Sequence, residues 1–388
     1  MPVPTDKSLL SSSAFADSKP HYQLLDGLRG VAALLVVWYH VHEGFAFASG
    51  APIITGINHG YLAVDFFFVL SGFVIGYAYD DRWGHNLATG SFFKRRLVRL
   101  HPMLVMGAVL GLVSFFLQGS VTWDGTHVMT SAAMLALLCA MLFIPAFPGS
   151  AYDVRGNAEA FSLNGPSWSL FFEYIGNVFY ALFLRKLSKK ALSAFVIVLG
   201  LGMLAMTCLD LPGYGCLSVG WSMADGGFWY GLSRMLFPFS MGMLLSRDFK
   251  PVKVKGAFWI CSAVLLALFL VPYIESEGAF HWNGFYESFC IIVMFPVLVT
   301  LGASGEVTDK FSSGLCKFLG DISYPLYITH YPAMYLFYWW MMKSGRATLA
   351  DTWPVVIALF LWCVLLAYAS LKLYDEPLRR WLGKRAKA

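Results

Sequence analysis

The chain alternates long apolar runs with short polar stretches over most of its length. Each run approaches the roughly 20 apolar residues that a helix needs to cross a bilayer. A chain in lipid must satisfy its own backbone hydrogen bonds, so runs of this length predict helices. The pattern predicts eleven apolar segments, at residues 31–47, 61–79, 103–117, 131–147, 168–184, 192–209, 228–245, 257–273, 286–301, 322–342 and 353–373.

Clusters of Lys and Arg indicate how these segments are oriented. Four such clusters occur, at residues 94–99, 185–190, 247–255 and 379–387, and the positive-inside rule places all of them in the cytoplasm. Three apolar segments separate the first two clusters, whereas two clusters on one side need an even number of crossings between them. We therefore expect segment 131–147 to be re-entrant or interfacial, which leaves about ten transmembrane helices with both termini cytoplasmic.

Composition agrees with an all-α integral membrane protein, a polytopic helical bundle. Hydrophobic residues make up 58% of the 388 residues and charged residues only 13%, against about 25% charged in soluble proteins. Residues 1–21 carry no apolar run of a signal peptide, so we expect a cytoplasmic tail there, a transmembrane domain over residues 22–380 and a basic cytoplasmic tail over residues 381–388.

Charge and cysteine usage exclude two classes of partner. The net charge of +5 resides in the short clusters between apolar runs, which is typical of topology determinants and argues against nucleic-acid binding. The seven cysteines show no paired spacing of metal ligands, so no metal is expected. The sequence does not indicate an oligomeric state.

The first apolar segment carries ionisable residues on one face. Arg29 and His40 are eleven residues apart, which is close to three full helical turns and about 16 Å along the axis. With Arg29 at the cytoplasmic boundary, His40 falls near the middle of a hydrocarbon core of about 30 Å. Ionisable residues at that depth are candidates for function, although a structural hydrogen bond to a neighbouring helix also accounts for His40. Glu43, one turn further, is suited to orient the imidazole.

The second apolar segment contains small and polar residues with two interpretations. Gly72 and Gly76 have the four-residue spacing that lets another helix approach closely, and packing is the preferred explanation. Ser71 is suited to hydrogen-bond either a substrate or the backbone. Asp65 is an acid within an apolar run, and we expect it to pair with an arginine or to support the site.

Further candidates lie in later segments. Arg96 and Arg99 are three residues apart and share a helix face, where their planar guanidinium groups suit phosphate. From the residues alone, a plain topology signal is the preferred explanation. Glu173 lies in the apolar stretch "SLFFEYIGN", where an ion pair is the structural alternative. His330 lies in "YITHYPAMY", whose aromatic residues suit a sugar-binding cavity, with structural hydrogen bonding as the alternative.

These motifs, taken in order, resemble the acyltransferase 3 family of integral-membrane acyltransferases. The family opens with an arginine, ten intervening residues and a histidine, and "LDGLRGVAALLVVWYH" matches that spacing. The resemblance continues over residues 22–380 through "FFFVLSGF", "KRRLVRLHP", "PSWSLFFEY", "ISYPLYITHYP" and "YDEPLRR". One departure is that many members have two adjacent acids where this chain has Glu173 and Tyr174, which puts any role of a second acid in doubt.

The resemblance implies a function for the protein and a role for each candidate site residue. It implies transfer of an acyl group, most simply acetyl from acetyl-CoA, to a hydroxyl of a cell-envelope or extracellular polysaccharide or its lipid-linked precursor, in the inner membrane of a bacterium. A small glycosylated natural product is the alternative acceptor, and a proton-coupled transporter is the alternative from another class. The implied roles are catalysis by His40 and Glu173, acyl-CoA binding by Arg29, Arg96, Arg99 and Ser71, and support or acceptor contact by Glu43, Asp65 and His330.

Overall fold

The computed structural model is a bundle of helices without β-strands in the parts of the chain it describes. It describes residues 19, 22–50, 58–85, 87–251, 254–307 and 309–385. Most of the expected N-terminal tail and the last three residues of the expected C-terminal tail lie outside these ranges. The helices are α1 (Gln23–Ser49), α2 (Ala63–Tyr79), α3 (Thr89–Leu117), α4 (Thr130–Met141), α5 (Ser167–Leu182), α6 (Lys189–Cys208), α7 (Gly227–Asp248), α8 (Ala257–Leu270), α9 (Trp282–Phe289), α10 (Phe295–Ser304), α11 (Lys310–Ser344), α12 (Leu349–Ser370) and α13 (Glu376–Arg385).

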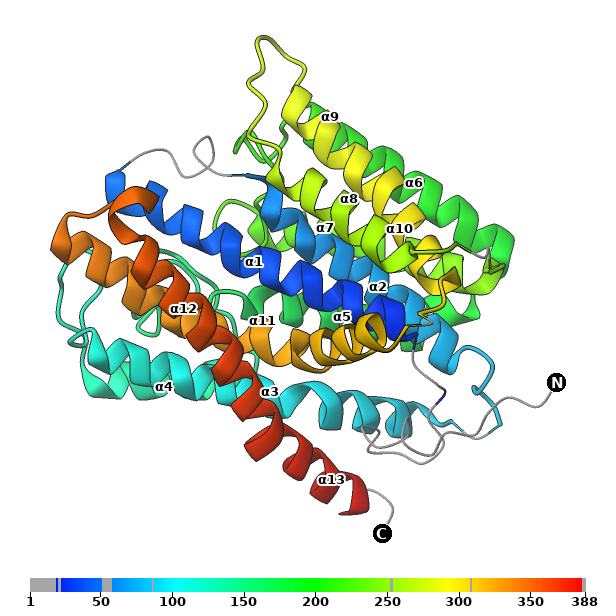
Figure 1. Cartoon of the computed structure of the whole chain (residues 1–388), viewed down its shortest axis with the longest axis horizontal. Helices are drawn as coiled ribbons and strands as arrows, with labels where there is room; N and C mark the ends of the chain where they lie inside the picture. The colour runs from blue at the N-terminus through cyan, green and yellow to red at the C-terminus, as the bar shows by residue number, and fades with distance from the viewer. Residues whose placement is uncertain are drawn as a thin grey trace.

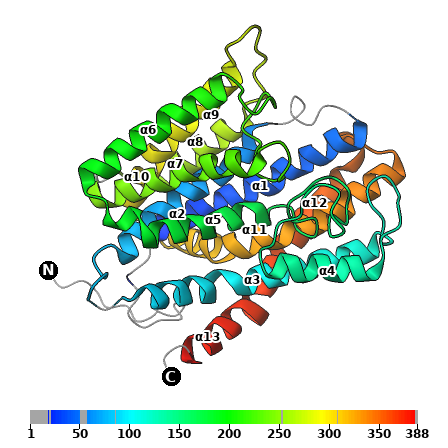
Figure 2. The same cartoon turned by 180° about the vertical axis from the view of Figure 1, so that it is seen from behind.

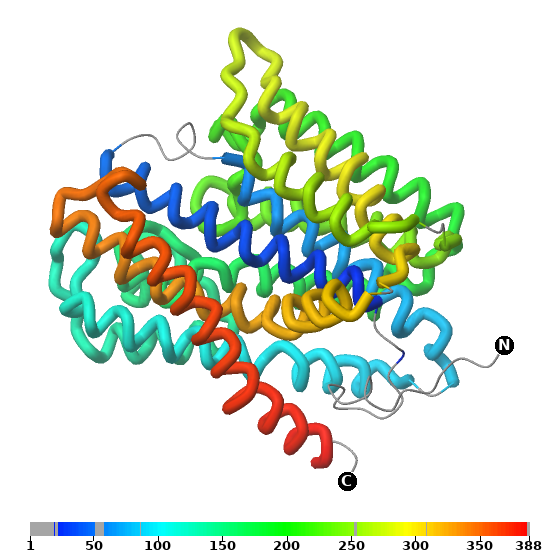
Figure 3. Tube along the Cα trace, in the orientation of Figure 1, coloured from blue at the N-terminus to red at the C-terminus, as the bar shows by residue number. Residues whose placement is uncertain are grey.

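Six helical stretches among the described residues are long and apolar enough to cross a membrane. Two of them continue through a π-helical segment. Segment η4 (Cys290–Met294) joins α9 to α10, and segment η5 (Leu371–Asp375) joins α12 to α13. Figure 3 follows the second of these as one unbroken tube that crosses α3 and leaves the bundle. The six stretches are Gln23–Ser49, His59–Tyr79, Thr89–Leu117, Lys189–Cys208, Trp282–Ser304 and Leu349–Arg385.

Two helices begin well before the apolar runs that predicted them. The expected segment 103–117 is the second half of α3, which starts at Thr89 and includes the basic cluster. The expected segment 322–342 belongs to α11, which starts at Lys310 because the side chain of Asp309 caps it by accepting a hydrogen bond from Ser312 N at 2.7 Å. Hydrophobicity detects the apolar part of a helix and misses the polar turns that extend it.

Helices α1 and α11 run side by side in the same direction through the middle of the molecule (Figure 1). Glycines allow the close approach: a Cβ on Gly30 would stand 2.3 Å from the carbonyl oxygen of Leu319. On one flank lie α6, α8, α9 and α10, and on the other lie α3 and α4 (Figures 1 and 2). The α1–α11 pair is therefore the central element of the fold.

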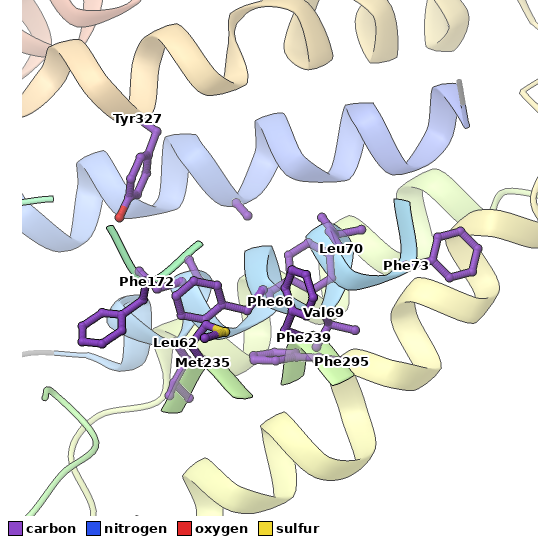
Figure 4. Packing of buried hydrophobic residues seen from close by; sticks show 14 of the residues in the cluster. Leu62, Phe66, Val69, Leu70, Phe73, Phe172, Met235, Phe239, Phe295 and Tyr327 are labelled. Carbon is purple, nitrogen blue, oxygen red and sulfur yellow. The ribbon is translucent and has the colours of Figure 1, made fainter. Parts of the chain in front are cut away.

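A second close pair is formed by α2 and α7. The predicted packing role of the glycines in α2 is confirmed, because a Cβ on Gly72 would stand 1.9 Å from the carbonyl oxygen of Phe239. Gly242 of α7 approaches the carbonyl oxygen of Val69 in the same way. Figure 4 shows Phe66 of α2 beside Phe239 and Phe295, with the rings of Phe66 and Phe295 5.6 Å apart. Helix α5 packs against α7 on the face seen in Figure 2.

Candidate active site

Arg29 and His40 both face α11, as the prediction of a shared stripe requires. Arg29 Nε donates to Ser323 Oγ at 2.8 Å, and its guanidinium pairs with Asp26 at 3.1 Å. The His40 ring lies against α11 as well, with its centroid 5.2 Å from that of His330. Because one straight helix carries both residues, their spacing of about 16 Å is fixed by the helical rise.

Three arginines gather at the N-terminal end of this stripe, and we call Arg29, Arg96 and Arg99 the arginine cluster. Arg96 is buried and pairs with Glu173 Oε1 at 2.7 Å, while its Nε has no partner among the described residues. Arg99 is half-buried, and its charge is repelled by those of Arg96 and Arg29. Glu173 and Asp26 face these three cations, and Asp375, which also acts on Arg99, is paired with Arg379 at 2.7 Å. Positive charge therefore remains in excess, so the cluster favours an anionic ligand.

Ser71 and Glu173 also belong to the arginine end of the site. Ser71 Oγ donates to Glu173 Oε1 at 3.2 Å, the same oxygen that pairs with Arg96. Within the part of the chain that the structure describes, Glu173 has no contact with His40. The sequence grouped Glu173 with His40 as catalytic, whereas the structure groups it with Arg96 and Ser71.

The opposite end of the stripe holds the histidine cluster, which comprises His40, Glu43, His330, Tyr331 and Tyr338. His40 Nδ1 lies 2.7 Å from Glu43 Oε2, and the same oxygen accepts from Tyr338 OH at 3.1 Å and Tyr331 OH at 3.4 Å. A carboxylate only accepts, so Nδ1 of His40 donates to Glu43, and in the neutral ring Nε2 is the lone pair. The arrangement is that of a general base held by an acid.

The two tyrosines were missed from the sequence, although a signal was present. Tyr331, Tyr335 and Tyr338 recur at helical spacing in "HYPAMYLFY" and therefore share one face of α11. Tyr338 OH donates to the backbone oxygen of His40 at 2.6 Å as well as to Glu43. Such spacing indicates a shared face, but only the fold reveals that this face meets Glu43.

A buried acid in the loop between α4 and α5 lies next to this cluster. Glu159 accepts a hydrogen bond from Tyr335 OH, and Arg155 lies over the same ring at 3.5 Å. Burial raises the pKa of Glu159 to about 7, against the opposing effects of the Tyr335 hydrogen bond and the nearby Arg155 charge. The negative charge of Glu43 adds to the rise, so the two acids are electrostatically linked.

Asp65 lies in a separate polar network. It forms a fully buried ion pair with Arg234 at 2.7 Å, and Arg234 also donates to the backbone oxygen of Tyr61 at 2.9 Å. Tyr61 OH in turn donates to Glu287, which accepts from Leu217 N at 2.8 Å. The expected pairing of Asp65 with an arginine is confirmed. Because Asp65 belongs to α2 and Arg234 to α7, this ion pair holds the two helices together.

Comparison with known proteins adds an independent line of evidence. Residues 22–372 match the family Acyl_transf_3, described as an acyltransferase domain. Acyltransferase MdmB of Streptomyces mycarofaciens is 26% identical over 93% of this chain and 92% of its own length. Protein 2 in the picA locus of Rhizobium radiobacter is 36% identical over 165 residues, which are 41% of this chain and 80% of that protein.

One relative is considerably longer than the region it shares. Peptidoglycan O-acetyltransferase OatA of Listeria monocytogenes is 24% identical over 94% of this chain, and the match spans 56% of OatA. No solved structure matches the chain.

Proposed function

The chain belongs to the acyltransferase 3 family and is an acyltransferase, and on that premise we propose that it moves an acetyl group from cytoplasmic acetyl-CoA to a hydroxyl of a cell-envelope or extracellular polysaccharide or its lipid-linked precursor. One observation carries this proposal. Helix α1 carries Arg29 and His40 about 16 Å apart, with the imidazole held by Glu43, and Arg96 and Arg99 of α3 join Arg29 in a cluster of three arginines.

The arginine cluster is suited to the phosphates of the donor. Guanidinium groups bind phosphate through paired hydrogen bonds and stay charged. Glu173 lies with the arginines, so we assign it to the donor site, where it holds Arg96 in place, and Ser71 supports Glu173. The pantetheine arm then extends along the α1–α11 pair toward His40.

His40 acts on the acceptor as the general base. Its Nε2 takes the proton of the attacking hydroxyl while the oxygen bonds to the thioester carbonyl carbon. The carbon–sulfur bond then breaks, and the same proton passes to the departing thiolate, so no other proton source is needed. Glu43 stabilises the positive imidazolium between these steps. A covalent acetyl-His40 intermediate is the alternative route.

The proposal includes about ten membrane crossings in the bacterial inner membrane, with both termini cytoplasmic. Helix α4 has 12 residues, about 18 Å of rise, which is less than any segment counted as a crossing and well below a hydrocarbon core of about 30 Å; this supports its assignment as the non-crossing element. Arg247 at the end of α7 donates to Leu187 O at 2.7 Å and pairs with Asp80 at 2.6 Å. Two basic segments thus meet at one end of the bundle, which supports a shared cytoplasmic side.

The test uses isotope-labelled acetyl-CoA and membranes that contain the protein. We expect His40→Ala to reduce acetyl transfer by about 100-fold or more, the usual contribution of a general base. His42→Ala is the matched control, because His42 bonds to the backbone of Trp38 on its own helix. Undiminished transfer by the His40 variant refutes the role of His40.

Mass spectrometry of the products identifies the acceptor. Acetyl groups on glycans support the proposal, and acetyl groups on a secreted small glycoside support the alternative acceptor. Solute movement driven by a gradient, without consumption of acetyl-CoA, indicates a transporter instead.

A further inference from the structure

His330 is a second buried histidine beside His40, with one ring nitrogen unaccounted for. Its side chain has no exposed surface, and Nδ1 lies 3.0 Å from the backbone oxygen of Leu326. A carbonyl oxygen only accepts, so Nδ1 carries the proton and Nε2 is a lone pair. That Nε2 has no partner among the described residues. A buried acceptor left without a hydrogen bond is costly, which makes it a candidate contact for a ligand.

The register of α1 against α11 locates His330 relative to His40. Arg29 bonds to Ser323, an offset of 294 residues, and Tyr338 bonds to the backbone of His40, an offset of 298 residues. The close approach of Gly30 to Leu319 and the bond from Tyr331 OH to Glu43 give smaller offsets, of 289 and 288 residues. His330 therefore lies beside residues 32–42 of α1, a stretch that includes His40 and extends about two turns toward the arginine cluster. Its ring is still only 5.2 Å from the His40 ring.

The Nδ1 atoms of the two rings are held from opposite directions along the helix axes. His40 Nδ1 is held by Glu43, which follows it toward the C-terminal end of α1. His330 Nδ1 is held by Leu326, which precedes it toward the N-terminal end of α11. Both Nδ1 atoms are therefore occupied by contacts within the protein, and Nε2 is the ring nitrogen that each histidine leaves for a ligand.

We infer that His330 Nε2 accepts a hydrogen bond from the amide N–H of the cysteamine unit of the acyl-CoA donor. This inference rests on the proposed function and adds a donor-binding residue to it. In acetyl-CoA the thioester sulfur is joined through two methylene groups to an amide N–H, which lies on the phosphate side of the sulfur. With the phosphates at the arginine cluster and the thioester at His40, this N–H lies a few bonds from the reacting carbonyl, and the His330 ring, 5.2 Å from the His40 ring, is within its reach. The contact fixes the thioester carbonyl within reach of the attacking hydroxyl.

The test compares two donors that differ only at this amide. One is acetyl-CoA, and the other is its analogue in which the cysteamine N–H is replaced by a methylene group. The readout is kcat/KM for acetyl transfer to the endogenous acceptor in membranes that contain the full chain. For the unmodified protein we expect acetyl-CoA to exceed the analogue by about 10-fold, the loss expected for one buried hydrogen bond left unmade.

Two variants separate donor contact from packing. In His330→Leu the position has no lone pair, so the two donors should become equal. In His330→Gln a side-chain oxygen replaces Nε2, so the preference for acetyl-CoA should partly return. If His330 only packs, or if a water molecule occupies Nε2, each variant should lower kcat/KM for both donors by the same factor. An unchanged ratio between the two donors therefore overturns the inference.

The outcomes also distinguish this inference from the proposed function. Equal use of both donors by the unmodified protein overturns the role of His330 and leaves acyl transfer from acetyl-CoA intact, even if neither variant folds. Failure of the unmodified protein to consume any thioester overturns the proposed function, and the role of His330 with it.

Discussion

Replacement of Glu43 by Gln tests the histidine cluster most directly, because it removes a charge and keeps the size of the side chain. Glu43 Oε2 accepts three hydrogen bonds, from His40 at 2.7 Å, Tyr338 at 3.1 Å and Tyr331 at 3.4 Å. A glutamine oxygen can still accept from His40, but it no longer offers a full negative charge to the imidazolium that forms during transfer.

The structure sets the size of the expected effect. A hydrogen bond to a charged group contributes about 1.5–3 kcal/mol. The Glu43 side chain is 20% exposed, so solvent screens part of its charge and we take about 2 kcal/mol. At 1.36 kcal/mol for each factor of ten, kcat for Glu43→Gln should fall about 30-fold. Glu43 lies 14 residues from Arg29, about 21 Å along the helix, so KM for acetyl-CoA should stay close to its original value.

The assay is the initial rate of acetyl transfer in membranes at saturating acetyl-CoA. Glu277→Gln, an exposed glutamate in the loop between α8 and α9, is the control and should behave like the unmodified protein. A kcat for Glu43→Gln within twofold of the control would show that the imidazole does not depend on this carboxylate. A large rise in KM with unchanged kcat would place Glu43 at the donor site instead.

Three further predictions concern other parts of the molecule. Arg99→Ala should raise KM for acetyl-CoA about 10-fold in the same assay, the loss of one charge-assisted phosphate contact, whereas the exposed Lys94→Ala should not. Asp65→Asn should lower the free energy of unfolding by about 3–5 kcal/mol, because Arg234 stays buried without its partner; thermal unfolding in detergent measures this, and the double variant Asp65→Leu with Arg234→Met should regain stability. Since the pKa of Glu159 is raised to about 7, the native state holds a proton that the unfolded state releases. The free energy of unfolding should therefore fall as pH rises from about 4.5 to 7 and level off above pH 7. Glu159→Gln should flatten this pH dependence. An equal pH dependence in both proteins would contradict the assignment of the raised pKa to Glu159.

The sequence predicted the shared face of Arg29 and His40 because that information is local. Arg29 and His40 lie on one α-helix, and a helix of known rise and turn determines both their shared face and their spacing. The same reasoning correctly indicated a packing role for Gly72, since a small residue is needed only where another backbone comes close.

Pairings between distant segments could not be predicted in the same way. Asp65 was expected to meet an arginine, but Arg234 lies 169 residues away, and nothing in the spacing favours it over the other arginines. Glu173 was assigned to catalysis by its place in a motif, whereas its ion pair with Arg96 depends on how α3 and α5 pack. The sequence gives no sign that Glu159 is buried beside the histidine cluster, because its partner Tyr335 lies on α11, far away in the chain.

In the proposed mechanism, the close packing of α1 against α11 would let one site serve two substrates from opposite sides. A donor anchored by its phosphates delivers its acyl group at a distance set by its own arm, so anchor and base must keep a constant separation. Helix α1 carries both Arg29 and His40, and Gly30 locks it against α11 with no room for a Cβ. Because α11 supplies Ser323 to the anchor and Tyr338 to the base, sliding of either helix would disturb both ends together. Under the proposed function, a rigid helix pair would thus perform the positioning that a closing domain performs in other enzymes.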